Sequence, residues 1–131
     1  MKSIELIVRI IIKRNNTFLF CKNKKRGNYY LIGGHVEFGD SLEETIYKEI
    51  KEEIGLKKEN ITNISYKTYF EQKFTQEEKV HHELNMIFTA NIPDNIKIIS
   101  KENHISFEWI DTKDIKNINL LPKKMIPLIV S

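Results

Sequence analysis

The segment at residues 41–54 constrains the fold most strongly, because both ends and one face of a helix are marked in it. Ser41 and Glu44 form a capping-box pattern at its start, and Gly55 supplies a stop after its last residue. The apolar residues of the segment recur at every fourth position and are Leu42, Ile46, Ile50 and Ile54. This spacing predicts an amphipathic helix with a single apolar stripe.

The rest of the chain reads mainly as strands. Apolar and polar residues alternate at residues 4–12 and 80–92, as in strands with one buried face. Four more segments have strand composition, namely residues 17–21, 29–32 (ending at Gly33-Gly34), 61–74 and 107–111. We expect Thr112 to cap a short helix and Pro122 to open a last helical piece. Without a regular βαβ rhythm, the predicted class is α/β or α+β, a mixed sheet with helices packed on it.

Composition limits the organisation and the partners. With 131 residues and no repeat or linker, a single domain spanning residues 1–131 is expected. The net charge of +3 is too small to indicate a binder of nucleic-acid polymers. Cys21 is the only cysteine, so neither an internal disulfide framework nor a cysteine metal cage is available. We expect a cytoplasmic protein without a signal peptide, a transmembrane helix or a membrane partner.

Three carboxylates of the predicted helix point to a metal site. At 100° per residue, Glu49, Glu52 and Glu53 fall within an arc of about 100°, beside the apolar stripe. Like charges at the seam with the rest of the domain repel one another and resist desolvation. A hard divalent cation such as Mg²⁺ would relieve both effects. Taken alone, the same three residues would more often decorate a solvated helix face.

The spacing around these carboxylates resembles the Nudix box, Gly-x5-Glu-x7-Arg-Glu-U-x-Glu-Glu-x-Gly-U, in which U is aliphatic. The match covers residues 34–56. The positions that agree outright are Gly34, Glu49, Ile50, Glu52, Glu53, Gly55 and Leu56. Asp40 and Lys48 depart from the family pattern while keeping the charge, because they stand for the first Glu and the Arg. Lys48 lacks the bidentate fork of Arg, but it lies one turn from Glu44 and Glu52 and is expected to orient them.

The resemblance to the Nudix family implies a fold, a reaction and a metal. The fold implied by the resemblance is that of Nudix domains, including MutT-like ones: an α/β/α sandwich with a mixed sheet and a loop–helix–loop catalytic box. They hydrolyse the diphosphate bond of nucleoside diphosphates linked to another group, with Mg²⁺ or Mn²⁺. By analogy, Glu49, Glu52 and Glu53 hold the metal together with the Gly33 carbonyl. Glu52 or Glu53 would also orient or deprotonate the attacking water.

Residues outside the helix complete the predicted site. Gly33 and Gly34 are expected to give the turn freedom and the diphosphate room. Arg26, in a basic run, could guide phosphates, and Tyr30 could stack a base; the alternatives are a solvated loop and core packing. We expect His81 and Glu83 to share the face of their strand that reaches the cleft, and His82 to find a partner in the core.

The general base is left open between two carboxylates. The resemblance to the Nudix family implies a further acidic residue, because some Nudix enzymes recruit one from a loop before a late strand. Glu102 is the only carboxylate of the loop at residues 101–106 and is the preferred candidate. Glu83 is the competing one, and a solvent-exposed loop Glu is the alternative role for Glu102.

Several functions remain open. A small-molecule nucleotide is the expected partner, and ADP-ribose-like or (deoxy)nucleoside triphosphate substrates are favoured over dinucleoside polyphosphates. One alternative is a nucleotide-binding sensor that kept the fold and lost turnover. Another is an acidic-helix domain that binds Ca²⁺ or a basic partner, although it would not need Gly34 and Gly55 at these distances. The number of metal ions and the choice between monomer and homodimer stay undetermined.

Overall fold

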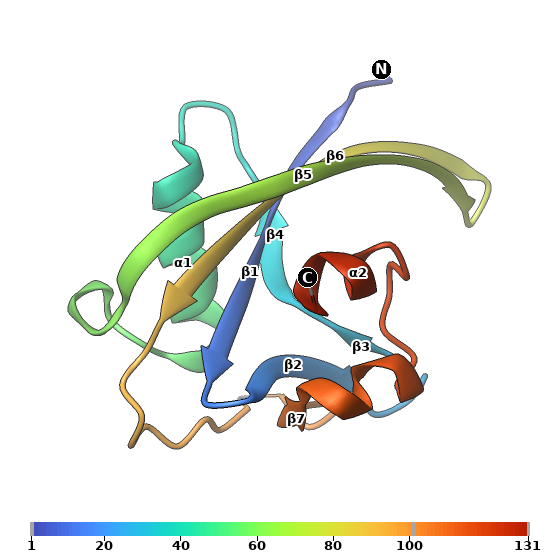
Figure 1. Cartoon of the computed structure of the whole chain (residues 1–131). Helices are drawn as coiled ribbons and strands as arrows, with labels where there is room; N and C mark the ends of the chain where they lie inside the picture. The colour runs from blue at the N-terminus through green and yellow to red at the C-terminus, as the bar shows by residue number, and fades with distance from the viewer. Residues whose placement is uncertain (1, 101, 131) are drawn as a thin grey trace.

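The computed structural model describes residues 2–100 and 102–130 and shows one mixed sheet with helices on both faces (Figure 1). The strands are β1 (Glu5–Arg14), β2 (Thr17–Asn23), β3 (Tyr29–Tyr30), β4 (Ile32–His35), β5 (Thr62–Gln76), β6 (Lys79–Asn91) and β7 (Ile105–Asp111). The α-helices are α1 (Leu42–Ile54) and α2 (Met125–Val130), and the short 3₁₀ helices are η1 (Lys58–Asn60) and η2 (Thr112–Asn117). The predicted fold class is confirmed.

Strand β1 is the centre of the sheet. The order is β3-β2-β1-β6-β5, with β4 also paired to β1 and β7 to β2. The β1–β6 pairing is parallel, whereas β1 pairs with β2 and β4 in antiparallel fashion. Because β1 takes part in these three pairings, it brings β4 and β6 to either side of the same few residues.

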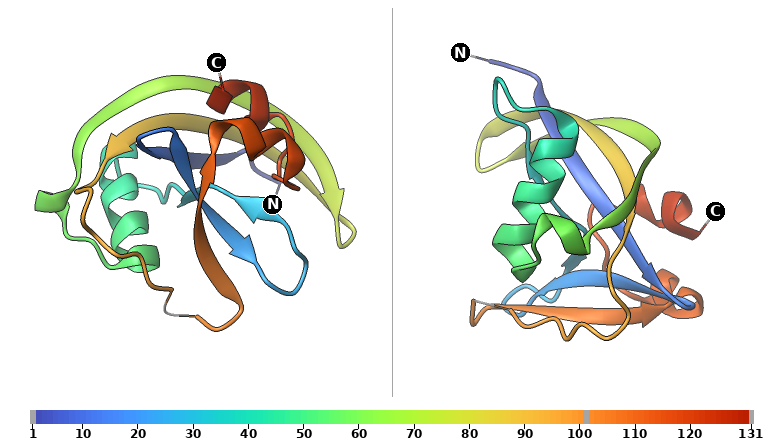
Figure 2. Two further views of the ribbon diagram at one scale, coloured as in Figure 1. Left: turned by 60° about the horizontal axis from the view of Figure 1, so that its bottom comes forward. Right: turned by 90° about the vertical axis from the view of Figure 1, so that its left-hand side faces the viewer.

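Both faces of the sheet are covered, which makes a sandwich (Figure 2). The apolar stripe of α1 packs with the even-numbered side chains of β1, so that one core contains Ile46, Ile50, Val8 and Ile10. Ile11 of β1 belongs to a second core on the opposite face, formed with residues of η2 and α2. The alternation of β1 therefore serves two cores, because apolar residues occur on both of its faces.

The predicted helix at residues 41–54 is confirmed as α1. The Ser41 hydroxyl oxygen accepts a hydrogen bond from the Glu44 backbone N–H at 3.0 Å. Gly55 has a φ of 73° and donates its N–H to the Lys51 carbonyl at 3.0 Å. A left-handed residue at this position is favourable for glycine, which has no Cβ to clash.

The segment at residues 29–32 differs from its prediction as one strand. It divides at Leu31 into β3, which pairs with β2, and β4, which pairs with β1. Gly33 and Gly34 lie inside β4, so the predicted turn at these residues is wrong. A Cβ at Gly33 would lie 2.1 Å from the Val8 carbonyl oxygen, and glycine is needed there for close approach of the two strands.

Two predictions about the last elements are also corrected. Asp111, not Thr112, caps η2, because its carboxylate accepts from the Lys113 backbone N–H at 3.1 Å. Helix α2 begins at Met125 and not at Pro122. Pro127 fits within the first turn of α2, where a helix does not use the backbone N–H. Within the described residues, no helix has the length and apolar character that crossing a membrane requires.

Candidate active site

Strand β4 and helix α1 form the centre of the site. The Gly33 backbone N–H donates a hydrogen bond to Glu53 Oε2 at 3.3 Å. A Cβ built on Gly34 would lie 2.4 Å from Glu49 Oε1, so the absence of a side chain makes room for this carboxylate. Glu52 is exposed beside them. The structure thus brings Gly33, Gly34 and the helix carboxylates together at the seam of helix and sheet.

Two carboxylates of α1 have raised pKa values. Burial raises the pKa of Glu53 to about 8, and the nearby charges of Glu49 and Glu52 add to the effect. The hydrogen bond from Gly33 and the charge of Arg9 oppose this shift in the pKa of Glu53. Burial, followed by the charge of Glu52, also raises the pKa of Glu49. A site that disfavours ionised carboxylates in this way is stabilised by a bound cation.

A polar network joins β1 to β6 and β5. Arg9 Nε donates to Asn85 Oδ1 at 2.8 Å, and Asn85 Nδ2 donates to Glu83 Oε1 at 3.3 Å. Gln72 Nε2 donates to the same Glu83 oxygen at 2.8 Å. Burial lowers the pKa of the Arg9 guanidinium, while the charges of Glu83 and Glu53 hold it up. Arg9 therefore acts electrostatically on both α1 and β6.

Arg9, Gln72 and Asn85 are not among the residues predicted from the sequence. Asn85 is fully buried and Glu83 is only 7% exposed, although both lie on the polar face of β6. A charged residue inside the apolar run of β1 was the available signal for Arg9. Its hydrogen-bond partner Asn85 lies 76 residues away, and only the pairing of β1 with β6 identifies it.

The network lines an open pocket of about 560 Å³. Its walls are formed by Arg9, Asn28, Tyr30, Gln72, Phe74, Thr75, Gln76, Glu83, Leu121 and Pro122. Two predicted substrate-binding residues, Tyr30 and Glu83, thus meet at one pocket. Burial raises the pKa of Tyr30 to about 12, with smaller effects from Cys21, Glu53 and Glu102. The Tyr30 hydroxyl is therefore held neutral and can donate a hydrogen bond into the pocket.

Other predicted site residues lie farther out. Lys48 Nζ lies 3.5 Å from Glu37 Oε1, a partner that the prediction did not include, and its orientation of Glu44 and Glu52 stays a prediction. The loop between β4 and α1 brings Glu37 within reach of Lys48, which sequence spacing along the helix cannot indicate. Both side chains are largely exposed, and a pair of this kind contributes little to stability. The charge of Lys48 still opposes the rise in the pKa of Glu49.

The two loop candidates, Arg26 and Glu102, are exposed. The Arg26 backbone N–H donates to Asn23 Oδ1 at 3.2 Å in the turn after β2. Glu102 Oε2 lies 3.3 Å from His104 Nε2 and close enough to Tyr30 to affect its pKa. Lys101 of the same loop lies outside the described residues.

His82 does not find its partner in the core, contrary to the prediction. Its Nε2 is hydrogen-bonded to the carboxylate of Glu71 on β5. The β5–β6 hairpin extends beyond the packed body of the molecule (Figure 1), and residues 75–80 at its end are exposed. The alternation of apolar and polar residues in β6 therefore predicts the two faces of the strand correctly. It does not predict that the strand is exposed near the hairpin turn.

Comparison with known proteins identifies the family. A sequence profile of the NUDIX domain matches residues 5–129. NAD-capped RNA hydrolase NudC of Klebsiella pneumoniae (strain 342) is 26% identical over 115 residues, covering 86% of this chain and 40% of the relative. ADP-ribose pyrophosphatase of Methanocaldococcus jannaschii is 45% identical over 49 residues, covering 35% of this chain and 29% of the relative. Nucleoside triphosphatase NudI of Escherichia fergusonii is 27% identical over 133 residues, covering 93% and 94%.

The fold agrees with this assignment. The crystal structure of MutT NUDIX hydrolase from Burkholderia pseudomallei matches with a TM-score of 0.77 at 17% identity, covering 99% of this chain and 100% of that one. The chain spans less than half the length of the NudC and ADP-ribose pyrophosphatase relatives. The profile nevertheless covers almost the whole chain, including β4, α1 and their facing glycines and carboxylates. On this evidence the chain belongs to the Nudix family.

Proposed function

We propose that this protein is a Nudix pyrophosphohydrolase that cleaves the diphosphate bond of a nucleoside diphosphate derivative with a divalent metal. The observation that carries the proposal is the gathering of Glu49 and Glu53 against the glycines of β4, where burial raises the pKa of both carboxyls. Such an arrangement costs free energy in the metal-free protein, and a bound cation would recover it.

The donor set fits Mg²⁺, or Mn²⁺ as the alternative. Glu49, Glu52 and Glu53 would supply carboxylate oxygens, and Gly33 a carbonyl oxygen, which are the donors that hard cations prefer. When bound, the metal offsets the charge on the phosphates and lowers the pKa of the attacking water. A nucleotide enters the site with like charge to these carboxylates, so the metal also makes its binding favourable.

The remaining residues have roles in binding and proton transfer. Arg9 is a cation that lines the pocket beside the carboxylates, and it would hold a phosphate group. Tyr30 would contact the base or ribose through its ring or its neutral hydroxyl. Glu52 or Glu53 would orient the water, and Glu102 remains our candidate for the general base because it is an exposed carboxylate whose charge reaches Tyr30 of the pocket.

Several relatives support a nucleotide substrate. The names of the similar proteins specify ADP-ribose, nucleoside triphosphates and the NAD cap of RNA. We favour ADP-ribose-like compounds or (deoxy)nucleoside triphosphates, which have the diphosphate linkage common to these substrates. Dinucleoside polyphosphates and capped RNA ends are the competing substrates.

The test is a substrate panel with Mg²⁺, Mn²⁺ or chelator, measured by phosphate and nucleotide release. The wild-type protein should require a divalent metal. Glu53→Gln should reduce kcat by at least about 100-fold with its melting temperature preserved, because it removes charge at the metal. Glu59→Gln, an exposed carboxylate of η1, is the matched control. Undiminished turnover in Glu53→Gln would refute the metal assignment, and tight ADP-ribose binding without turnover under any metal would indicate the sensor.

A further inference from the structure

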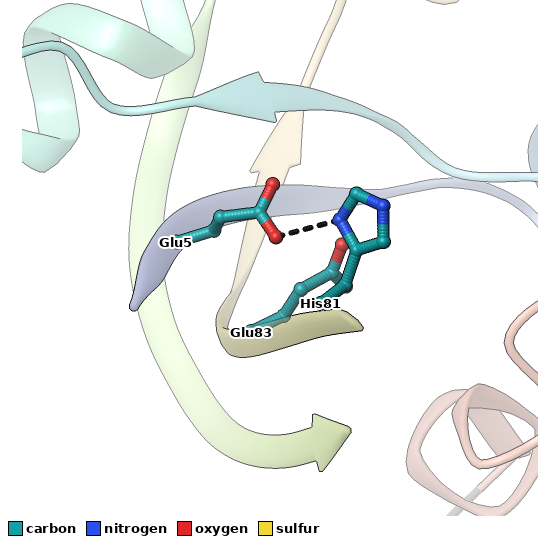
Figure 3. Close-up of side chains that lie close together, drawn as sticks. All are labelled: Glu5, His81 and Glu83. Atoms are coloured by element: carbon teal, nitrogen blue, oxygen red, sulfur yellow. Dashed lines mark hydrogen bonds and ion pairs between the residues drawn. The ribbon is translucent and has the colours of Figure 1, made fainter. Parts of the chain in front are cut away.

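Three possible metal ligands meet on the strands β1 and β6 (Figure 3). Glu5 is opposite Glu83 in the parallel β1–β6 register. His81 lies two residues before Glu83 and therefore on the same face of β6. One ligand atom from each of the three lies within 4.8 Å of the others. A modest contraction would bring these atoms to the separations found around a metal ion.

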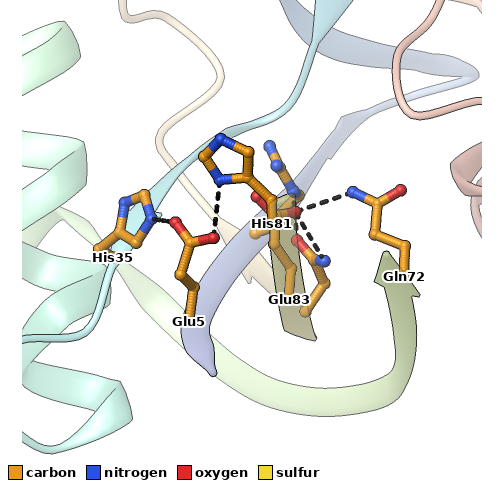
Figure 4. Close-up of polar contacts among 7 residues, drawn as sticks. Glu5, His35, Gln72, His81 and Glu83 are labelled. Atoms are coloured by element: carbon orange, nitrogen blue, oxygen red, sulfur yellow. Dashed lines mark hydrogen bonds and ion pairs between the residues drawn. The ribbon is translucent and has the colours of Figure 1, made fainter. Parts of the chain in front are cut away.

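Neighbouring residues hold each of these three side chains in place (Figure 4). His35 Nε2 is hydrogen-bonded to Glu5 Oε1 at 2.8 Å, and His81 Nδ1 to Glu5 Oε2 at 2.9 Å. The His81 ring is stacked on Phe74 with centroids 4.9 Å apart. This support limits the rearrangement that ion binding would require.

Glu83 is held from the other side. Gln72 and Asn85 both donate to Glu83 Oε1, at 2.8 and 3.3 Å, which leaves Oε2 for another ligand. The carboxylate is also 93% buried, since Glu83 is 7% exposed. Arg9, which acts on Glu83 electrostatically, is the nearby charge that would oppose an ion. Glu5 and Glu83 together supply two negative charges, which exceed the single positive charge of Arg9.

Two cavities adjoin the cluster. Glu5 and His81 line a cavity of about 810 Å³, and Glu83 lines the pocket of about 560 Å³ that also contains Arg9 and Tyr30. An ion could therefore reach the cluster without unfolding of the sheet. Three protein ligands would leave a fourth position for water or for an oxygen of a bound compound.

We propose that Glu5, His81 and Glu83 form a second metal site, selective for a divalent transition ion of the Zn²⁺ class. An imidazole nitrogen with two carboxylate oxygens suits Zn²⁺ and Co²⁺ better than Mg²⁺, which prefers oxygen donors only. Its ligand set differs from the one proposed on α1, because none of its ligands comes from that helix. It would stand even without hydrolytic activity.

Titration of the metal-free protein with Co²⁺, in excess Mg²⁺, tests this site through the visible absorption of bound cobalt. We expect His81→Gln and Glu5→Gln to weaken Co²⁺ binding by at least about tenfold. His82→Gln is the matched control, because its ring contacts Glu71 on the opposite face of β6. Glu53→Gln should retain the cobalt bands, which distinguishes this site from the one on α1.

Three results would overturn the proposal. The first is the absence of cobalt bands in the wild-type protein. The second is unchanged Co²⁺ affinity in both His81→Gln and Glu5→Gln. The third is loss of the bands in Glu53→Gln, which would assign the ion to α1. Circular dichroism of each variant shows whether it folds, and the rise in melting temperature that Zn²⁺ causes in the wild type is an independent measure that needs no variant.

Discussion

Replacing Gly34 by alanine should inactivate the enzyme while leaving its fold intact. The added Cβ would lie 2.4, 2.5 and 2.8 Å from Oε1, Cδ and Oε2 of Glu49. Since ordinary van der Waals contact begins at roughly 3.4 Å, the carboxylate must retreat by about 1 Å. It can do so because it is the end of a flexible side chain. A displacement of this size at a metal ligand is expected to lower kcat by about 100-fold.

Gly33→Ala provides the contrast. Its Cβ would lie 2.1 Å from the Val8 carbonyl oxygen and 3.0 Å from the Arg9 Cα, both in the backbone of β1. No side chain can move aside, so the β1–β4 pairing itself must yield. We expect a loss of stability of roughly 1–3 kcal/mol, the usual range for overpacking. Thermal unfolding should therefore separate the two variants, with only Gly33→Ala lowering the melting temperature markedly.

The mechanism behind the Gly34→Ala effect can be tested with Glu49→Asp. The shorter side chain withdraws the carboxylate from the new methyl group, so its effect on kcat should be smaller in the Gly34→Ala background than in the wild type. Assays of kcat and of Mg²⁺ dependence on the four proteins complete the cycle. Wild-type kcat and Mg²⁺ affinity in Gly34→Ala, or a fall in its melting temperature equal to that of Gly33→Ala, would refute the reasoning.

The remaining predictions concern charge. The pKa of Glu53, raised to about 8, means that the metal-free folded protein binds more protons than the unfolded chain above pH 4.5, so its free energy of unfolding should fall as pH rises towards 8. Mg²⁺ binding at pH 7 should therefore release protons, measured by calorimetry in two buffers; no release would contradict the shift. Lys48→Arg should keep kcat equal or higher, because its contact with Glu37 is exposed, and a large loss in the kinetic assay would show a specific role for lysine. Glu102→Gln should lower kcat and alter the pH–rate profile more than Glu83→Gln, whereas unchanged kcat and metal affinity would exclude Glu102 as general base.

Local signals in the sequence account for much of the framework. The capping box, the four-residue apolar spacing and Gly55 act within a few positions of one another, and α1 forms between the predicted ends. The carboxylates of α1 lie on one arc for the same reason, since helix geometry alone relates Glu49 to Glu53. The segments in which apolar and polar residues alternate form strands, because a repeat of two residues matches the two faces of a strand and not a helix.

Tertiary structure decided the surroundings of these elements. The division at Leu31 follows from pairing with two different strands, and the Lys48–Glu37 contact follows from the path of a loop. Neither has a local sequence signal, because each depends on where another part of the chain lies.

The polar groups of the cleft show this dependence most clearly. Arg9 meets Asn85, and Glu5 meets His81, across 76 residues each. Both contacts require the parallel register of β1 and β6, which depends on strand order as well as on the composition of either strand. The sequence by itself therefore determined the helix, the strands and the helical carboxylates, whereas only the folded sheet decided which polar residues of β1 and β6 would meet.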